Sequence, residues 1–139
     1  MSTILIVEDE PSILILMAGI LEASGHVVLK ASALEEALQQ FENVDASIDL
    51  LIADVNLPGT SGVRIALELL SSLPNLAVIL TSGHTPDMWD QDDLAQLNEV
   101  PPESVAILQK PFLPAALLQA ASRFVSVPIL PGIALERAS

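Results

Sequence analysis

Three carboxylates stand at the ends of two short apolar segments. Glu8 and Asp9 follow the run at residues 3–7, and Asp54 closes the run at residues 50–53. If both runs are parallel strands of one sheet, their carboxyl ends meet at one edge and bring the acids together. Converging carboxylates repel one another unless a cation compensates their charge. Oxygen ligands of this kind suit Mg²⁺, which binds one or two carboxylates and keeps some of its water.

Two side chains at the ends of later apolar runs extend this set. Thr81 offers a hydroxyl and Lys110 an ammonium group. Residues two apart in an extended segment point the same way, so Asn56 lies within reach of the same edge as Asp54 and could add its main-chain carbonyl to a metal site. A carboxylate nucleophile with a cation, a hydroxyl donor and a lysine suits phosphoryl transfer to Asp54.

Composition limits the classes of function. Five basic residues against eighteen acidic ones give a formal charge of −13, which repels nucleic-acid backbones and anionic lipids. The chain has no cysteine, which excludes disulfides and thiolate metal sites. The first residues do not resemble a signal peptide, and the uncharged run at residues 13–21 is too short to span a bilayer. We expect a cytoplasmic protein that binds neither nucleic acid nor membrane.

Strand-like and helix-like segments alternate along the 139 residues. Strands are predicted at residues 3–7, 26–31, 49–54, 75–82 and 105–109. Helices are predicted from Pro11 to Gly25, from a Ser32–Glu35 capping box to Asn43, and at residues 62–73, 91–97 and 114–125. The alternation indicates an α/β protein with a parallel sheet, right-handed crossovers and helices on both faces. The pattern weakens at residues 83–104, where we expect only a short or irregular fourth helix.

Four motifs together resemble the response-regulator receiver domain of bacterial two-component signalling. They are Ile-Leu-Ile-Val-Glu8-Asp9-Glu-Pro, Asp54-Val-Asn-Leu-Pro-Gly-Thr-Ser-Gly, Ile-Leu-Thr81-Ser-Gly-His and Gln-Lys110-Pro-Phe. The resemblance covers residues 4–125 and implies a doubly wound, flavodoxin-like sheet with strand order 2-1-3-4-5. The Leu-Thr81-Ser-Gly-His motif is similar to that of atypical receivers common in alphaproteobacteria, which suggests a bacterial source.

The resemblance implies a role for each candidate residue. It makes Asp54 the phosphoacceptor and places Thr81 and Lys110 against the phosphoryl group. It implies Mg²⁺ ligands at Asp54, at Asp9 directly, at Glu8 mainly through water and at the carbonyl of Asn56. It also implies a cis peptide bond between Lys110 and Pro111.

One position departs from the receiver pattern. Receivers often carry an aromatic residue three positions before the lysine, which swings inward when the threonine moves toward the phosphoryl group. Ile107 occupies that position here. A phosphorylation signal would therefore travel by another displacement, such as that of residues 83–104.

The functional expectation is a single-domain response regulator, with a receiver at residues 1–127 and a tail at 128–139 that lacks an output domain. It would accept phosphate from a sensor histidine kinase or phosphotransfer protein and act through contact with an output protein or as a phosphate sink. No enzymatic activity is expected beyond its own phosphorylation and dephosphorylation. The alternative is a receiver-fold adaptor that works without phosphorylation. A Mg²⁺-dependent phosphohydrolase ranks last, because Asn56 cannot serve as general acid or base.

The sequence allows more than one role for each of two surfaces. Trp89, with Met88, could anchor a partner or fold back over its own loop. The core face of the first helix is assigned to Ile13, Leu16, Met17, Ile20 and Leu21. The opposite face, with Leu14, Ile15 and Ala18, could receive a phosphodonor, form a homodimer, or be covered by Ile129, Leu130 and Ile133. His84 is expected in solvent, and His26 is assigned no role.

Overall fold

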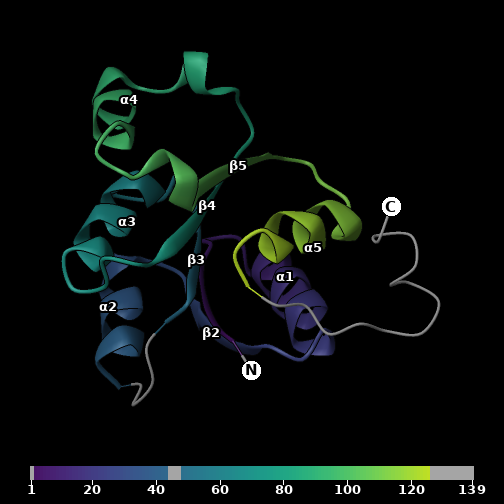
Figure 1. Cartoon of the computed structure of the whole chain (residues 1–139). Helices are drawn as coiled ribbons and strands as arrows, with labels where there is room; N and C mark the ends of the chain where they lie inside the picture. The colour runs from purple at the N-terminus through teal and green to yellow at the C-terminus, as the bar shows by residue number, and fades with distance from the viewer. Residues whose placement is uncertain (1, 44–47, 126–139) are drawn as a thin grey trace.

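The structure, a computed structural model, describes residues 2–43 and 48–125. Five strands and five α-helices alternate along the chain (Figure 1). The strands are β1 (Thr3–Val7), β2 (Val27–Ala31), β3 (Leu50–Asp54), β4 (Ala77–Ser82) and β5 (Val105–Gln109). The helices are α1 (Pro11–Ala23), α2 (Leu34–Asn43), α3 (Gly62–Leu70), α4 (Gln91–Leu97) and α5 (Pro114–Ser122). Two short 3₁₀ helices, η1 (Pro86–Met88) and η2 (Pro102–Ser104), flank α4.

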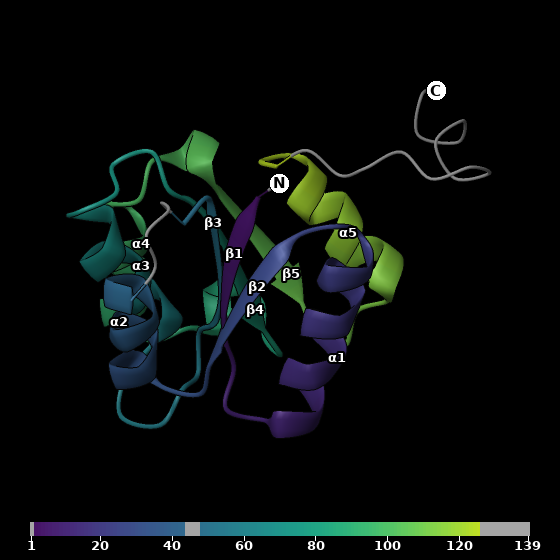
Figure 2. The ribbon, with the colours of Figure 1, turned by 90° about the horizontal axis from the view of Figure 1, so that it is seen from below.

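All strand pairs are parallel, and the sheet has the order β2-β1-β3-β4-β5. The expected doubly wound α/β fold with strand order 2-1-3-4-5 is therefore confirmed. Seen along the sheet in Figure 2, helices α2, α3 and α4 cover one face, and α1 and α5 cover the other. This arrangement places every strand's carboxyl end at one edge of the sheet, where the candidate residues are.

The strands carry apolar side chains on both faces, as a sheet covered on both sides requires. Alternate residues contribute to two separate cores, because successive side chains of a strand point to opposite faces. Leu51 and Ala53 of β3 belong to the core under α2, α3 and α4, whereas Leu50 and Ile52 belong to the core under α1 and α5. The central strands are thus held from both sides.

The core face of α1 differs from the sequence prediction. Ala18, expected on the opposite face, is buried with Met17 and Leu21, whereas Leu16, expected in the core, is 59% exposed. A helix that is apolar almost all round offers no polar stripe to fix its rotation, so contacts with the sheet and α5 decide it. Ile15, expected on the face away from the core, is 66% exposed.

The start of α2 also differs from the prediction. Ser32 bonds Glu36 rather than Glu35: its backbone N–H and its hydroxyl both donate to the Glu36 carboxylate, the N–H at 2.8 Å. The helix begins only at Leu34, which moves the bonding partner one residue along. The helix ends at Asn43 as expected, and α3 and α5 end three residues earlier than expected.

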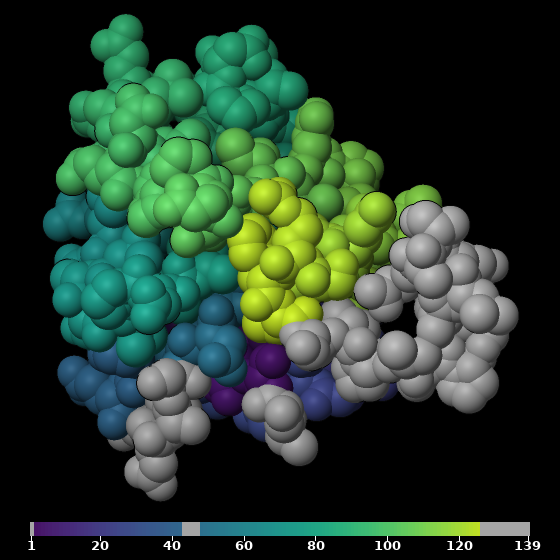
Figure 3. Space-filling view, in the orientation of Figure 1, coloured from purple at the N-terminus to yellow at the C-terminus, as the bar shows by residue number. Residues whose placement is uncertain are grey.

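The segment between β4 and β5 holds a short α-helix, α4, between two 3₁₀ helices, and the short fourth helix agrees with the weak sequence pattern. Helix α4 lies beside α3 in Figure 1, and the space-filling view of Figure 3 shows their surfaces adjoining. Trp89 folds back into the protein's own core and is 8% exposed, which decides between the two alternatives for this residue. Met88 remains 66% exposed.

Candidate functional site

The carboxyl edge of the sheet brings together the candidate residues from four strands. Asp54 ends β3, and Thr81 of β4 is its neighbour in register. Glu8 and Lys110 follow directly after β1 and β5. Glu8, Asp54 and Thr81 are 1%, 7% and 1% exposed, so these polar groups are buried among apolar strands.

Lys110 joins the two buried carboxylates. Its Nζ lies 2.7 Å from Glu8 Oε1 and 2.8 Å from Asp54 Oδ2. Its own side chain is 19% exposed, so water still reaches part of it. The peptide bond from Lys110 to Pro111 is cis, as the family resemblance implies.

Main-chain amides bind the remaining carboxylate oxygens. The Glu10 N–H donates to Glu8 Oε2 at 3.1 Å, and the Asn56 N–H donates to Asp54 Oδ1 at 3.0 Å. Burial raises the pKa of Glu8, although the bonds from Lys110 and the Glu10 amide oppose this. For Lys110, burial acts to lower the pKa, but Asp54 and Glu8 outweigh it and the pKa is raised. Lys110 therefore carries its charge at neutral pH.

Asp9 adds a third acid on the solvent side. One carboxylate oxygen each from Glu8, Asp9 and Asp54 lies within 4.8 Å of the others. Asp9 and Asn56 also line one groove of about 490 Å³ between the loop after β3 and α4. Oxygen donors gathered in this way fit a hard divalent cation that keeps some of its water.

Comparison with known proteins identifies the family of the chain. Residues 4–122 match the response regulator receiver domain. The chain belongs to this family. Receiver domains act in two-component signalling, accept phosphate on an aspartate, generally bind Mg²⁺ at an acidic pocket, and interact with histidine kinases and phosphotransfer proteins.

Individual relatives place the receiver in longer proteins and in small ones. The present chain is 30% identical, over 63% of its length, to the sensor kinase CckA of Brucella abortus, and it spans 9% of that protein. It is 39% identical over 59% of its length to the transcriptional activator protein ExaE of Pseudomonas putida, of which it spans 38%. The structure of chemotaxis protein CheY4 of Vibrio cholerae superposes with a TM-score of 0.74 at 25% identity, covering 90% of this chain and 99% of that one.

Gly62 is a further part of the receiver's site that motif spacing does not explain. A Cβ at this position would lie 2.5 Å from the main-chain oxygen of Asp54. The glycine lets α3 begin against the main chain of Asp54. A glycine after a Thr-Ser pair was the only signal in the sequence, and it does not reveal the close contact.

The two histidines differ in their surroundings. His84 is exposed after β4, as predicted. His26 is 5% exposed just before β2, and its Nε2 has no hydrogen-bond partner. Burial lowers the pKa of His26, with a smaller effect from the positive N-terminus. His26 lies at the sheet edge opposite Asp54, and so outside the site.

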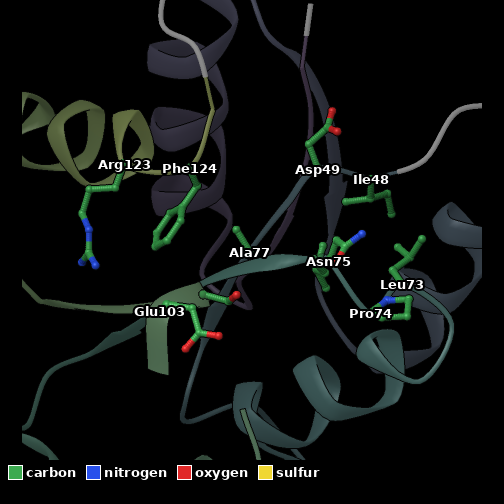
Figure 4. A pocket seen from close by; sticks show the side chains of 11 residues that line it. Ile48, Asp49, Leu73, Pro74, Asn75, Ala77, Glu103, Arg123 and Phe124 are labelled. Atoms are coloured by element: carbon green, nitrogen blue, oxygen red, sulfur yellow. The ribbon is translucent and has the colours of Figure 1, made fainter. Parts of the chain in front are cut away.

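A second groove, of about 500 Å³, opens at the amino edge of the sheet. Figure 4 shows Asp49, Asn75, Glu103 and Arg123 around it, with Phe124 between them. These residues stand before the strands or after α5, far along the strands from Asp54. The groove is therefore separate from the carboxylate cluster around Asp54. Within residues 2–43 and 48–125, no helix has both the length and the apolar character needed to cross a bilayer.

Proposed function

We propose that this receiver accepts a phosphoryl group on Asp54 from a phosphohistidine of a sensor kinase or phosphotransfer protein. The observation that carries the proposal is the position of the Asp54 carboxylate. It lies at the carboxyl end of the buried strand β3, 2.8 Å from Lys110 Nζ and within 4.8 Å of two further acids.

The neighbours of Asp54 supply what the transfer needs. A carboxylate oxygen of Asp54 attacks phosphorus, and the bond from phosphorus to the histidine nitrogen breaks. Lys110 stands where its charge can offset the negative phosphoryl oxygens. Thr81, the register neighbour of Asp54, can donate its hydroxyl to one of those oxygens.

Mg²⁺ is the metal that the site fits best. Asp9, Asp54 and the Asn56 carbonyl would hold it, with Glu8 acting mainly through water. When bound, the ion would neutralise charge on the phosphoryl oxygens. Glu8 is already bonded to Lys110 and to a main-chain amide, which supports an indirect role for it.

Helix α1 offers a surface for the phosphodonor. It begins at Pro11, directly after the acids of the site, and exposes Ile15 and Leu16. Large apolar side chains exposed together are typical of interaction surfaces. A homodimer through this surface is the alternative. Residues 129, 130 and 133, which could also cover it, lie outside the described residues.

The proposed output is contact with another protein, or removal of phosphate from a kinase as a sink. The formal charge of −13 argues against direct binding of nucleic acid or of an anionic membrane. We expect the protein to work in the cytoplasm and to catalyse nothing beyond its own phosphorylation and dephosphorylation.

Intact mass after incubation with acetyl phosphate and Mg²⁺ tests the proposal. We expect one added phosphoryl group on the native protein and none on Asp54→Asn or after metal chelation. A phosphoryl group that persists on Asp54→Asn would exclude Asp54 as the acceptor.

A phosphorylation-independent adaptor is the second candidate. The observation that favours it is Ile107, which lacks an aromatic ring and is 41% exposed on β5. An adaptor would bind its partner equally well as native protein and as Asp54→Asn, in a pull-down with quantified bait. Loss of binding in the variant would exclude the adaptor.

A further inference from the structure

Trp89 links the segment after β4 to the core. It is the chain's single tryptophan. Its indole Nε1 donates to the main-chain carbonyl of His84 at 3.1 Å. The ring is 8% exposed and belongs to the apolar cluster against which Leu94 and Leu97 of α4 pack. One side chain thus contacts both the β4–α4 loop and the core beneath α4.

A short series of bonds leads from Asp54 to this side chain. The N–H of Val55, next to Asp54, donates to the Thr81 carbonyl at 2.9 Å. Ser82 follows Thr81 and is fully buried, and its hydroxyl oxygen accepts from the His84 N–H at 3.1 Å. The His84 carbonyl then receives the Trp89 indole N–H. The path uses main-chain groups and two buried side chains.

Ile107 cannot provide this link. It lies on β5, paired with Leu80 of β4, and its 41% exposed side chain has no donor group. Trp89, by contrast, has a polar N–H in an apolar setting. A buried donor that loses its acceptor costs more than an ordinary hydrogen bond contributes. If the loop at His84 shifts, the indole has to follow it or leave its N–H unpaired.

We propose that Trp89 couples the state of Asp54 to the position of α4. This inference rests on the proposed function and adds a residue through which the signal leaves the site. Displacement of Thr81 toward a phosphoryl group moves residues 82–84, and the bond to the His84 carbonyl carries Trp89 with them. Trp89 then shifts α4 and the exposed Met88 beside it. Trp89 is a positioning residue, because it does not touch the phosphoryl group.

The absence of cysteine from the chain allows a direct test. A single Ala95→Cys, exposed on α4, carries an environment-sensitive fluorophore, and a matched protein carries it at Gln119→Cys on α5. Each full-length protein is titrated with beryllium fluoride and Mg²⁺ as a phosphoryl mimic. Binding of the mimic is followed separately by fluorine NMR. We expect the emission of the α4 label, and that of native Trp89, to change as the mimic binds, with the α5 label changing little.

Two variants decide whether the indole N–H is responsible. Trp89→Phe keeps an apolar ring but removes the donor, whereas His84→Ala keeps the main-chain acceptor and removes only an exposed side chain. We expect Trp89→Phe to bind the mimic yet lose at least half of the α4 response, and His84→Ala to respond like the native protein.

Three outcomes would overturn the inference. One is an α4 response of native size in Trp89→Phe, even if its melting temperature falls, because the bond would then be structural only. Another is mimic binding to the native protein without any α4 response. The third is an equal loss of response in His84→Ala. Failure of the native protein to bind the mimic would count against the proposed function itself, and fluorine NMR separates that result from the others.

Discussion

The two edges of the sheet carry similar residue types in different surroundings. At the carboxyl edge, Glu8 and Asp54 are buried and bonded to Lys110. At the amino edge, Glu103 and Arg123 line one open groove, and both are exposed. Among the described residues, the ion pairs present are the two that Lys110 makes. Acidic and basic residues near a sheet edge are therefore not sufficient to form a compact charged site, and burial of these groups distinguishes the carboxyl edge.

Buried polar groups divide between the same two edges. The carboxyl edge buries charged groups that compensate one another, together with Thr81 and Ser82. The amino edge buries Ser24, which donates to the Ile20 carbonyl, and His26, which burial keeps neutral. The carboxyl edge thus keeps charged groups that could take part in chemistry, whereas the buried polar groups of the amino edge are uncharged.

Removing the central cation should break this contrast most strongly. Lys110→Met leaves Glu8 and Asp54 facing each other without compensation. We expect the free energy of unfolding to fall by about 3 kcal/mol, the low end for an unpaired buried charge, because Glu8 can take up a proton. Arg123→Met at the amino edge should change it by less than about 0.5 kcal/mol. Urea denaturation of both variants measures the difference, and equal effects would contradict the contrast.

Close packing behind Asp54 gives the next largest effect. In Gly62→Ala the new Cβ would lie 2.5 Å from the Asp54 carbonyl oxygen, so the main chain has to move. We expect a loss of about 2 kcal/mol by urea denaturation and slower labelling by acetyl phosphate. Gly19→Ala on α1 is the matched control, since nothing lies within 4 Å of its Cβ. This control should gain up to about 1 kcal/mol from helix propensity, and a similar loss in both variants would argue against a special contact at Gly62.

Much of this organisation is predictable from the sequence for definite reasons. The strand at residues 105–109 and the helix at 91–97 are observed with the predicted bounds. The acids were expected to meet because parallel strands end at a common edge, and the structure brings Glu8, Asp9 and Asp54 together. Local pattern and topology suffice for such features.

Other features depend on contacts that no local pattern encodes. Helix α1 is apolar on nearly every side, so its rotation, and with it the exposure of Leu16, follows from its neighbours. Ser32 could bond either of two adjacent acids, and the residue at which α2 begins places Glu36 within reach. Trp89 packs into the apolar core, where a main-chain carbonyl five residues away accepts its N–H. These details could not be predicted without the fold.

The stabilisation of the protein by Mg²⁺ should depend on Asp9, the exposed acid at the carboxyl edge. Asp9 lies in the acidic cluster, whereas the ion pairs of Lys110 are with Glu8 and Asp54, so Asp9→Asn relieves repulsion. In metal-free buffer we expect stability to rise by about 1 kcal/mol. Mg²⁺ should stabilise the native protein by binding the folded state, and this increment should be lost in the variant. Glu68→Gln on α3 should keep the full increment.

Thermal melts with Mg²⁺, Ca²⁺ and matched ionic strength separate site binding from screening. An equal rise in melting temperature with salt alone would contradict a specific site. An undiminished Mg²⁺ increment in Asp9→Asn would remove Asp9 from the ligand set.

The smallest expected effect is the pH dependence of stability that His26 causes at the amino edge. Burial lowers the pKa of His26 in the folded protein, so below the ordinary histidine value of about 6.5 the unfolded chain binds a proton that the folded chain resists. Its contribution to stability is therefore complete above that value and is lost as pH falls toward the lowered pKa. His26→Phe removes this loss, so its melting temperature should fall less than that of the native protein between neutral and mildly acidic pH. His84→Phe, at an exposed position, should follow the native curve, and identical slopes for all three proteins would show that His26 protonates freely in the folded state.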